Sequence, residues 1–136
     1  MILIYNIIIH LYSILIHLAS VFNPKAKRWV QGRRGILKAL VAQIDREKPM
    51  AWFHCASLGE FEQGRPVIEG FSECFPDFQI LVTFFSPSGY EVRKNYGGAD
   101  YIFYLPIDTI TNANKFLELT NPDIAIFIKY EYWFNY

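Results

Sequence analysis

Charged side chains are absent from the first 22 residues, and several other chemical signals are scarce in this chain of 136 residues. Only two cysteines occur, Cys55 and Cys74, in unlike contexts and without the spacing of a metal site. We therefore expect both to be reduced packing residues of a cytosolic domain, and we expect no bound metal. No Gly-x-Gly-x-x-Gly sequence occurs, so nothing supports a dinucleotide site.

The uncharged segment 1–22 consists mainly of Ile, Leu, Val, Tyr and Phe, and it ends at Asn23-Pro24. About 20 such residues form a helix long enough to span a bilayer. The polar residues recur in steps of four and three, which places them on one narrow stripe: Asn6, His10, Ser13, His17 and Ser20. The pattern predicts a membrane-associated helix over 1–23, with lipid on most sides and protein or water along one seam. A cleaved signal peptide is not indicated, because the segment has no basic start and no small-residue cleavage site.

Charge is unevenly distributed, although the formal net charge of the chain is zero. Residues 23–49 hold eight basic residues against two acidic ones, whereas residues 50–136 hold five against eleven. Basic residues beside a hydrophobic helix mark the cytoplasmic side of a membrane and attract anionic headgroups. We predict a basic amphipathic helix over 24–48 whose cations meet an anionic membrane surface: Lys25, Lys27, Arg28, Arg33 and Arg34. A solvated helix face explains the same charges, and nucleic acid is a poor partner because the remaining domain is acidic.

Beyond Pro49, short apolar runs alternate with segments of helical periodicity. The expected strands lie at about 50–55, 79–84, 101–104 and 124–128, and the expected helices at about 60–75, 89–96 and 110–120. This alternation predicts an α/β fold, a parallel and doubly wound sheet with helices on both faces. Pro66 is expected to kink or restart the first of these helices. Ligands of such sheets bind at the carboxyl ends of the strands.

Glu60 stands at this edge, since the apolar run Ala51 to Ala56 ends in a Ser-Leu-Gly turn and Glu60 opens the next helix. Ser57-x-x-Glu60 has the form of a capping box, in which each side chain satisfies a backbone N–H of the other residue. Gly59 leaves room for a ligand beside the carboxylate. Glu60 is therefore either a helix cap or a group that faces a ligand, and the spacing alone favours the cap.

Three later turns reach the same edge of the predicted sheet. The turn Ser86-Pro-Ser-Gly89 begins a helix. Either its free backbone N–H groups hold a phosphate or a carboxylate, or the turn is an ordinary N-terminal cap with proline in the first turn. Asp108 follows the third strand and is expected to cap the next helix. Lys129 and Glu131 follow the fourth strand, as a charge pair beside Glu60 or as an ordinary surface ion pair.

The stretch His54-Cys-Ala-Ser-Leu-Gly-Glu60 resembles the His-x-x-Ser-x-Gly-Glu signature of the 3-deoxy-D-manno-octulosonic acid (Kdo) transferases of lipopolysaccharide synthesis. Three further stretches resemble motifs of that family in the same order, and the resemblance covers about residues 1 to 136. They are Leu81 to Gly89 (Thr-x-x-Ser/Thr-Pro-Ser/Thr-Gly), Tyr104 to Asp108 (Tyr-x-Pro-x-Asp) and Lys129 to Asn135 (Glu-Thr-Glu-Leu-Trp-Pro-Asn). Two departures occur: Lys129 stands where the family usually has glutamate, and Phe134 where it usually has proline.

The resemblance implies the amino-terminal half of a GT-B type glycosyltransferase, preceded by a hydrophobic helix. Residues 49–136 would form its Rossmann-like acceptor-side domain, and a nucleotide-sugar domain would follow Tyr136, so we expect the fragment alone to be inactive. The implied reaction is inverting transfer of Kdo from CMP-Kdo to a lipid A precursor, lipid IVA, at the cytoplasmic face of the inner membrane. The family implies no cofactor, and CMP-Kdo would be bound mainly by the second domain.

On this resemblance, Glu60 is the candidate general base for the acceptor hydroxyl. The candidate acceptor-binding residues lie at the ends of the strands: Ser57, Gly59, Ser86, Ser88, Gly89, Lys129 and Glu131. Two other functions stay open, a non-catalytic membrane-tethered binding module and another GT-B glycosyltransferase that uses a different nucleotide sugar. A second α/β domain in the complete gene product would favour an enzyme over a binding module. Selection of a cytidine rather than a uridine nucleotide sugar would favour a Kdo transferase over another GT-B glycosyltransferase.

Overall fold

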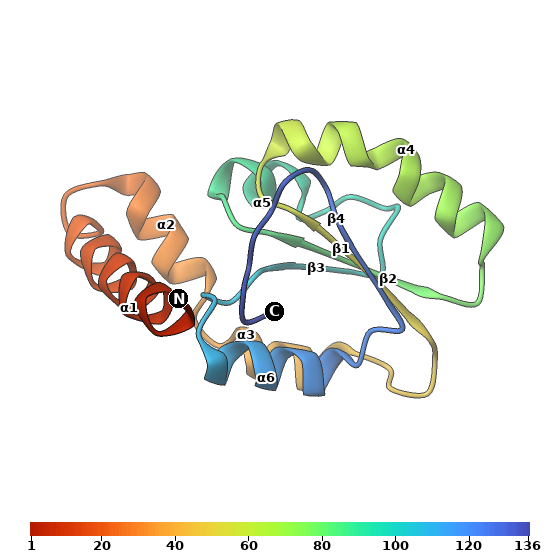
Figure 1. The fold of residues 1–136 in the computed structure, drawn as a ribbon. Helices are drawn as coiled ribbons and strands as arrows, with labels where there is room; N and C mark the ends of the chain where they lie inside the picture. Colours follow the sequence, from red (N-terminus) through yellow and green to blue (C-terminus); the bar gives the residue numbers. More distant parts are fainter.

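The computed structural model describes residues 1–136 and is built on a four-stranded parallel sheet with the order β3-β2-β1-β4 (Figure 1). The strands are β1 (Met50–Cys55), β2 (Gln79–Phe84), β3 (Tyr101–Tyr104) and β4 (Ile124–Phe127). These bounds confirm the predicted strands to within one residue, and the parallel sheet confirms the predicted Rossmann-like α/β class. Because β1 pairs with both β2 and β4, the loops after β1 and β4 leave the sheet side by side.

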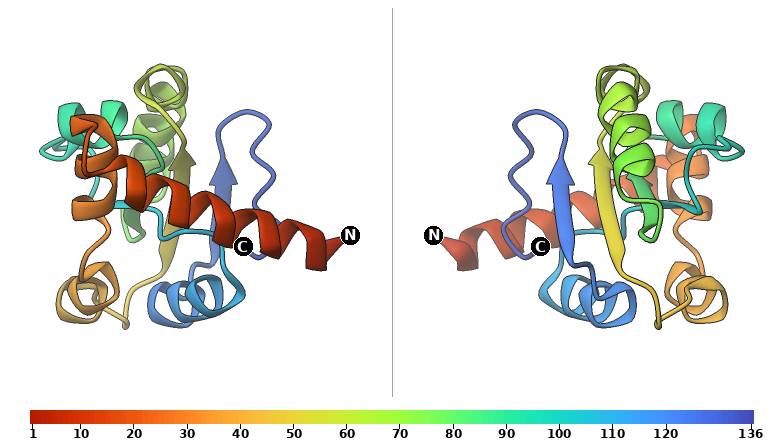
Figure 2. Two further views of the ribbon diagram at one scale, coloured as in Figure 1. Left: turned by 90° about the vertical axis from the view of Figure 1, so that its left-hand side faces the viewer. Right: turned by 90° about the vertical axis from the view of Figure 1, so that its right-hand side faces the viewer.

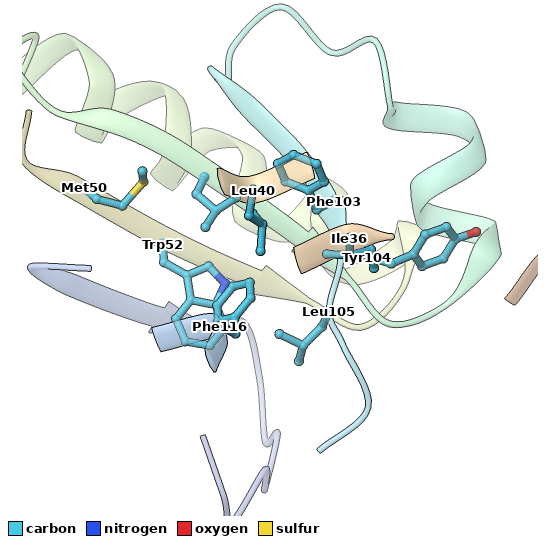
Figure 3. Close-up of a cluster of buried hydrophobic side chains, with 9 residues drawn as sticks. Ile36, Leu40, Met50, Trp52, Phe103, Tyr104, Leu105 and Phe116 are labelled. Carbon is cyan, nitrogen blue, oxygen red and sulfur yellow. The ribbon is translucent and has the colours of Figure 1, made fainter. Parts of the chain in front are cut away.

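Helices cover both faces of the sheet, as expected for buried parallel strands. The upper face in Figure 1 carries α4 (Leu58–Cys74) and α5 (Pro87–Arg93), and the lower face carries α3 (Ile36–Gln43) and α6 (Ile110–Thr120). Every residue of β1 and β2 is buried, and alternate side chains enter opposite cores. Trp52 packs in the lower core with Leu40 and Phe116, as Figure 3 shows. Phe53 packs in the upper core with Phe61.

The basic segment forms two helices where one was predicted. α2 (Pro24–Gly32) ends before a turn at Gly35, and α3 begins immediately after it. Gly35 has a φ of 75°, in the left-handed region that glycine adopts without steric cost. The turn lets Ile36 and Leu40 enter the lower core while α2 remains outside the sheet. The predicted helical periodicity was therefore correct on each side of Gly35, but the continuous helix was wrong.

The uncharged segment forms α1 (Ile2–Ala19), which crosses the carboxyl-end loops of the sheet (Figure 2). Tyr12 of α1 packs against Phe85, which follows β2, and Tyr5 packs against Phe134 beyond β4. Most of its large apolar side chains are exposed. The helix is long and apolar enough to cross a membrane, with a mean hydropathy of 2.0 over 18 residues. One such helix is weak evidence of a membrane span by itself, because signal sequences pass the same test.

Three local predictions differ from the structure. Pro66 lies within an uninterrupted α4 and does not restart that helix, because the apolar face on both sides of it packs on the sheet. Cys55 is buried as predicted, whereas Cys74 is exposed at the end of α4. Asp108 does not cap α6, since the side chain of Thr109 accepts the capping hydrogen bond instead.

Candidate active site

The loops after β1 and β4 bring two carboxylates to the carboxyl edge of the sheet, those of Glu60 and Glu131. Burial and then the negative charge of Glu60 raise the pKa of Glu131 above its ordinary value. Burial, followed by the charges of both glutamates, also raises the pKa of the Cys55 thiol to about 12. The edge therefore holds a pair of interacting carboxylates above a thiol that is not ionised at neutral pH.

Glu60 forms the predicted capping box in the first turn of α4. Its Oε2 accepts a hydrogen bond of 3.1 Å from the backbone N–H of Ser57, and its other oxygen accepts none. Gly59 is exposed, and a Cβ atom at that position would meet nothing within 4 Å. A carboxylate has lone pairs for several hydrogen bonds. The two interpretations of Glu60 are therefore compatible, because one oxygen caps the helix while the other accepts no hydrogen bond within the protein.

Lys129 does not form the predicted ion pair with Glu131. It is exposed, and no carboxylate lies within 4.0 Å of its amino group. Its φ of 68° places it in the left-handed region, and its carbonyl oxygen accepts a hydrogen bond from the backbone N–H of Glu131. This tight turn leaves Glu131 beside Glu60 without a cation between them.

The turn after β2 has the geometry of a helix cap, one of its two predicted roles. Ser86 is the N-cap of α5, and its hydroxyl oxygen accepts a hydrogen bond of 3.3 Å from the backbone N–H of Ser88. Gly89 is buried, and a Cβ atom there would lie 2.2 Å from the ring of Phe84. Glycine at this position is therefore explained by close packing against β2. The exposed side chain of Ser88 remains at the same edge as Glu60.

His54 of the first motif is fully buried on the face of β1 opposite to Cys55. The indole N–H of Trp52 donates to the hydroxyl oxygen of Thr83 at 2.8 Å, and the same hydroxyl lies 2.8 Å from Nδ1 of His54. The threonine hydroxyl therefore bridges Trp52 and His54, while Nε2 of His54 is buried without a hydrogen-bond partner. Burial lowers the pKa of His54 to about 3, so it is neutral at physiological pH and supports the sheet rather than exchanging protons.

The shifted pKa of His54 predicts a specific dependence of stability on pH. Burial of the neutral His54 ring contributes fully to the free energy of unfolding above the ordinary histidine pKa of 6.5. This contribution is lost as the pH falls toward about 3, the pKa in the folded protein. The free energy of unfolding should decline over that range by up to about 1.4 kcal/mol per pH unit. Denaturant unfolding of the wild type and His54→Asn at several pH values measures the two slopes. The free energy of unfolding of His54→Asn should fall less steeply with decreasing pH than that of the wild type. Parallel pH dependences for the two proteins would contradict a lowered pKa for His54.

Arg33 is wrongly included in the predicted set of membrane-facing cations. Its guanidinium donates hydrogen bonds to the carbonyl oxygens of Phe85 at 2.7 Å, Leu105 at 2.9 Å and Trp29 at 3.2 Å. It also lies 3.8 Å from the centre of the Trp29 ring. Arg33 therefore joins α2 to the segments that follow β2 and β3, instead of extending into solvent. The other four cations of the set are exposed and form no ion pair: Lys25, Lys27, Arg28 and Arg34.

Asp108 and Asn135, from the third and fourth motifs, form a buried junction with α1 that the sequence reasoning missed. Asp108 is fully buried, and one of its carboxylate oxygens accepts hydrogen bonds from the Tyr5 hydroxyl and from the backbone N–H of Asn135. The Asn135 amide in turn donates to the Asp108 carbonyl oxygen at 2.7 Å and to the side chain of Asn6 at 2.9 Å. The presence of both residues in motifs was a signal of their importance, but it did not indicate this contact.

The parallel sheet, with the carboxylates of Glu60 and Glu131 at its carboxyl edge, defines a Rossmann-like α/β domain with a candidate acid–base site. Residues 28–136 match the family model described as 3-deoxy-D-manno-octulosonic-acid transferase (kdotransferase). The chain belongs to this family of transferases, in agreement with the resemblance of its four motifs.

Curated proteins named 3-deoxy-D-manno-octulosonic acid transferase are similar to most of the chain. The protein from Chlamydia muridarum is 32% identical over 97 residues, which are 69% of this chain and 22% of that protein. The protein from Aquifex aeolicus is 33% identical over 87 residues, 63% of this chain and 24% of that protein. The protein from Haemophilus influenzae is 29% identical over 85 residues, 62% of this chain and 20% of that protein. The chain thus spans about a fifth to a quarter of the length of these relatives.

Proposed function

We propose that this chain is the acceptor-side part of a Kdo transferase, which moves Kdo from CMP-Kdo to a lipid A precursor such as lipid IVA. Membership of the Kdo transferase family carries this proposal, since the matched segment contains the whole carboxyl edge. In this arrangement CMP-Kdo is bound mainly by a second domain, as in a GT-B glycosyltransferase. No metal or other cofactor is needed, because the donor is already an activated sugar.

Glu60 acts in this proposal as the general base. The acceptor is a sugar hydroxyl, a weak nucleophile that needs a base within hydrogen-bond reach. The free oxygen of Glu60 takes the hydroxyl proton as the acceptor oxygen bonds to the anomeric carbon of Kdo. The bond from that carbon to the phosphate of CMP breaks, and CMP leaves with the electron pair. Attack opposite to the leaving group inverts the anomeric centre without a covalent enzyme intermediate.

The surrounding residues hold the acceptor in the proposed reaction. The backbone N–H of Ser57 orients the carboxylate of Glu60, and Gly59 leaves the approach open. Glu131, which binds a proton more readily than an ordinary glutamate, donates or accepts hydrogen bonds with the sugar. Lys129 is exposed at the edge and is available to an acceptor phosphate. The turn after β2 completes the proposed set: Ser86, Ser88 and Gly89.

The position of α1 supports a reaction at the cytoplasmic face of the inner membrane. The exposed apolar surface of α1 adjoins the same carboxyl-end loops that carry the carboxylates, so a lipid acceptor can reach them from the bilayer. Exposed Lys25, Lys27, Arg28 and Arg34 follow α1 closely and suit anionic headgroups. Fractionation of cells that express the complete gene product checks this location, and recovery in the soluble fraction would refute it.

The activity is tested by incubating the complete gene product with lipid IVA and either CMP-Kdo or a uridine nucleotide sugar. Mass spectrometry of the lipid should show addition of Kdo with the cytidine donor alone. Transfer from the uridine donor would instead indicate another GT-B glycosyltransferase. Binding of lipid IVA without transfer from either donor would indicate a membrane-tethered binding module.

A further inference from the structure

A pocket of about 420 Å³ lies between α1, the turn that joins α2 to α3, and the loop that leads into α6. It is separate from the carboxylate site, and neither Glu60 nor Glu131 lines it. From α1 it receives Ser13 and His17, one helical turn apart on the same face. Its lining contains three cations and no carboxylate: Arg33, Arg34 and Lys38.

The positive charge of this pocket is not neutralised within the protein. No carboxylate lies within 4.0 Å of Arg33, Arg34 or Lys38. Arg33 is held in place by carbonyl oxygens and aromatic rings alone, and its burial lowers its pKa to about 9 while leaving it charged at neutral pH. A buried cation without a counter-ion costs free energy. An anion in the pocket would supply the missing counter-charge.

The pocket also adjoins an apolar surface. Ser13 and His17 line it, while their neighbours Ile14, Leu15 and Leu18 are exposed, each with more than half of its surface accessible. Charged residues begin directly after α1, so a bilayer that covers the apolar surface would place the pocket at the level of the headgroups. A matching ligand has an anionic head and an apolar tail.

We propose that this pocket binds the phosphomonoester headgroup of a lipid. A phosphomonoester carries a charge of about −1.5 to −2 at neutral pH, and its oxygens suit the paired N–H groups of arginine. The inference goes beyond the proposed transfer reaction, since it assigns a discrete headgroup site in addition to diffuse attraction by exposed cations. Soluble phosphomonoesters share the same chemistry, but the adjacent apolar surface of α1 favours the lipid.

The test measures binding of the whole chain to phosphatidylcholine vesicles that contain phosphatidic acid or phosphatidylglycerol, at matched surface potential. The wild type should prefer phosphatidic acid, a phosphomonoester, by about tenfold in Kd. The double variant Arg34→Gln/Lys38→Gln should lose this preference. The control Lys27→Gln/Arg28→Gln removes the same charge from exposed positions outside the pocket. It should weaken binding to both vesicles equally and retain the preference.

Three results would overturn the proposal. Equal binding of the wild type to both kinds of vesicle, or equal loss of preference in both double variants, would show that only the overall charge matters. Glycerol 3-phosphate provides the soluble arm of the experiment and should compete only weakly with the vesicles. If it competes as strongly as phosphatidic acid itself, the pocket is a site for soluble phosphomonoesters and the lipid assignment fails. Circular dichroism of each variant verifies that the fold is intact.

Discussion

Replacing Glu60 with glutamine is expected to lower the turnover of the complete gene product by about 100-fold or more, the scale of a positioned general base. Glutamine at this position still accepts the hydrogen bond from the backbone N–H of Ser57, since a capping box tolerates Glu or Gln. The substitution therefore removes the base while it keeps the cap. Steady-state rates with CMP-Kdo and lipid IVA measure the effect on kcat.

Two further variants separate catalysis by Glu60 from its structural role. Glu73→Gln removes a carboxylate from the exposed end of the same helix and should leave turnover unchanged. Glu60→Ala removes both base and cap, so it should also reduce the free energy of unfolding by about 1 kcal/mol. Near-normal turnover of Glu60→Gln, with a stability loss confined to Glu60→Ala, would mean that Glu60 only caps α4.

Replacing Asp108 with alanine is expected to reduce the free energy of unfolding by about 3 kcal/mol. The substitution leaves two partly buried donors, the Tyr5 hydroxyl and the backbone N–H of Asn135, without their acceptor, and an unsatisfied donor costs about 1–3 kcal/mol. It also releases the link between α1 and the loop before α6. Denaturant unfolding of the chain in detergent solution measures the loss.

The matched control for this prediction is Asp77→Ala, which removes an exposed carboxylate that accepts no hydrogen bond. Its effect should stay within about 0.5 kcal/mol. In a double-mutant cycle, Asp108→Ala and Tyr5→Phe should cost less together than the sum of the single losses, because both remove the same hydrogen bond. Additive losses, or an Asp108→Ala variant as stable as the control, would exclude Asp108 as the junction between α1 and the domain.

The sequence by itself determined the elements of the domain and the edge where its candidate site lies. Strands and helices follow from apolar periodicity, and the turn after β1 follows from the capping pattern of Ser57 and Glu60. These signals are local, because each depends on residues within about one turn or one strand of each other. The adjacency of β1 and β4 in the sheet then brings Glu60 and Glu131 to this edge.

Tertiary structure alone decided the roles of Asp108, Arg33 and Lys129. Asp108 was predicted as a cap because its partner Tyr5 lies 103 residues away, a distance at which spacing carries no information. Arg33 belonged by sequence to a basic run, but folding surrounds it with carbonyl oxygens from two other segments. The left-handed turn at Lys129 keeps that side chain apart from Glu131, and side-chain charge alone does not specify the backbone conformation. Burial and pairing arise only when distant segments pack together, and for these three residues they outweigh local preference.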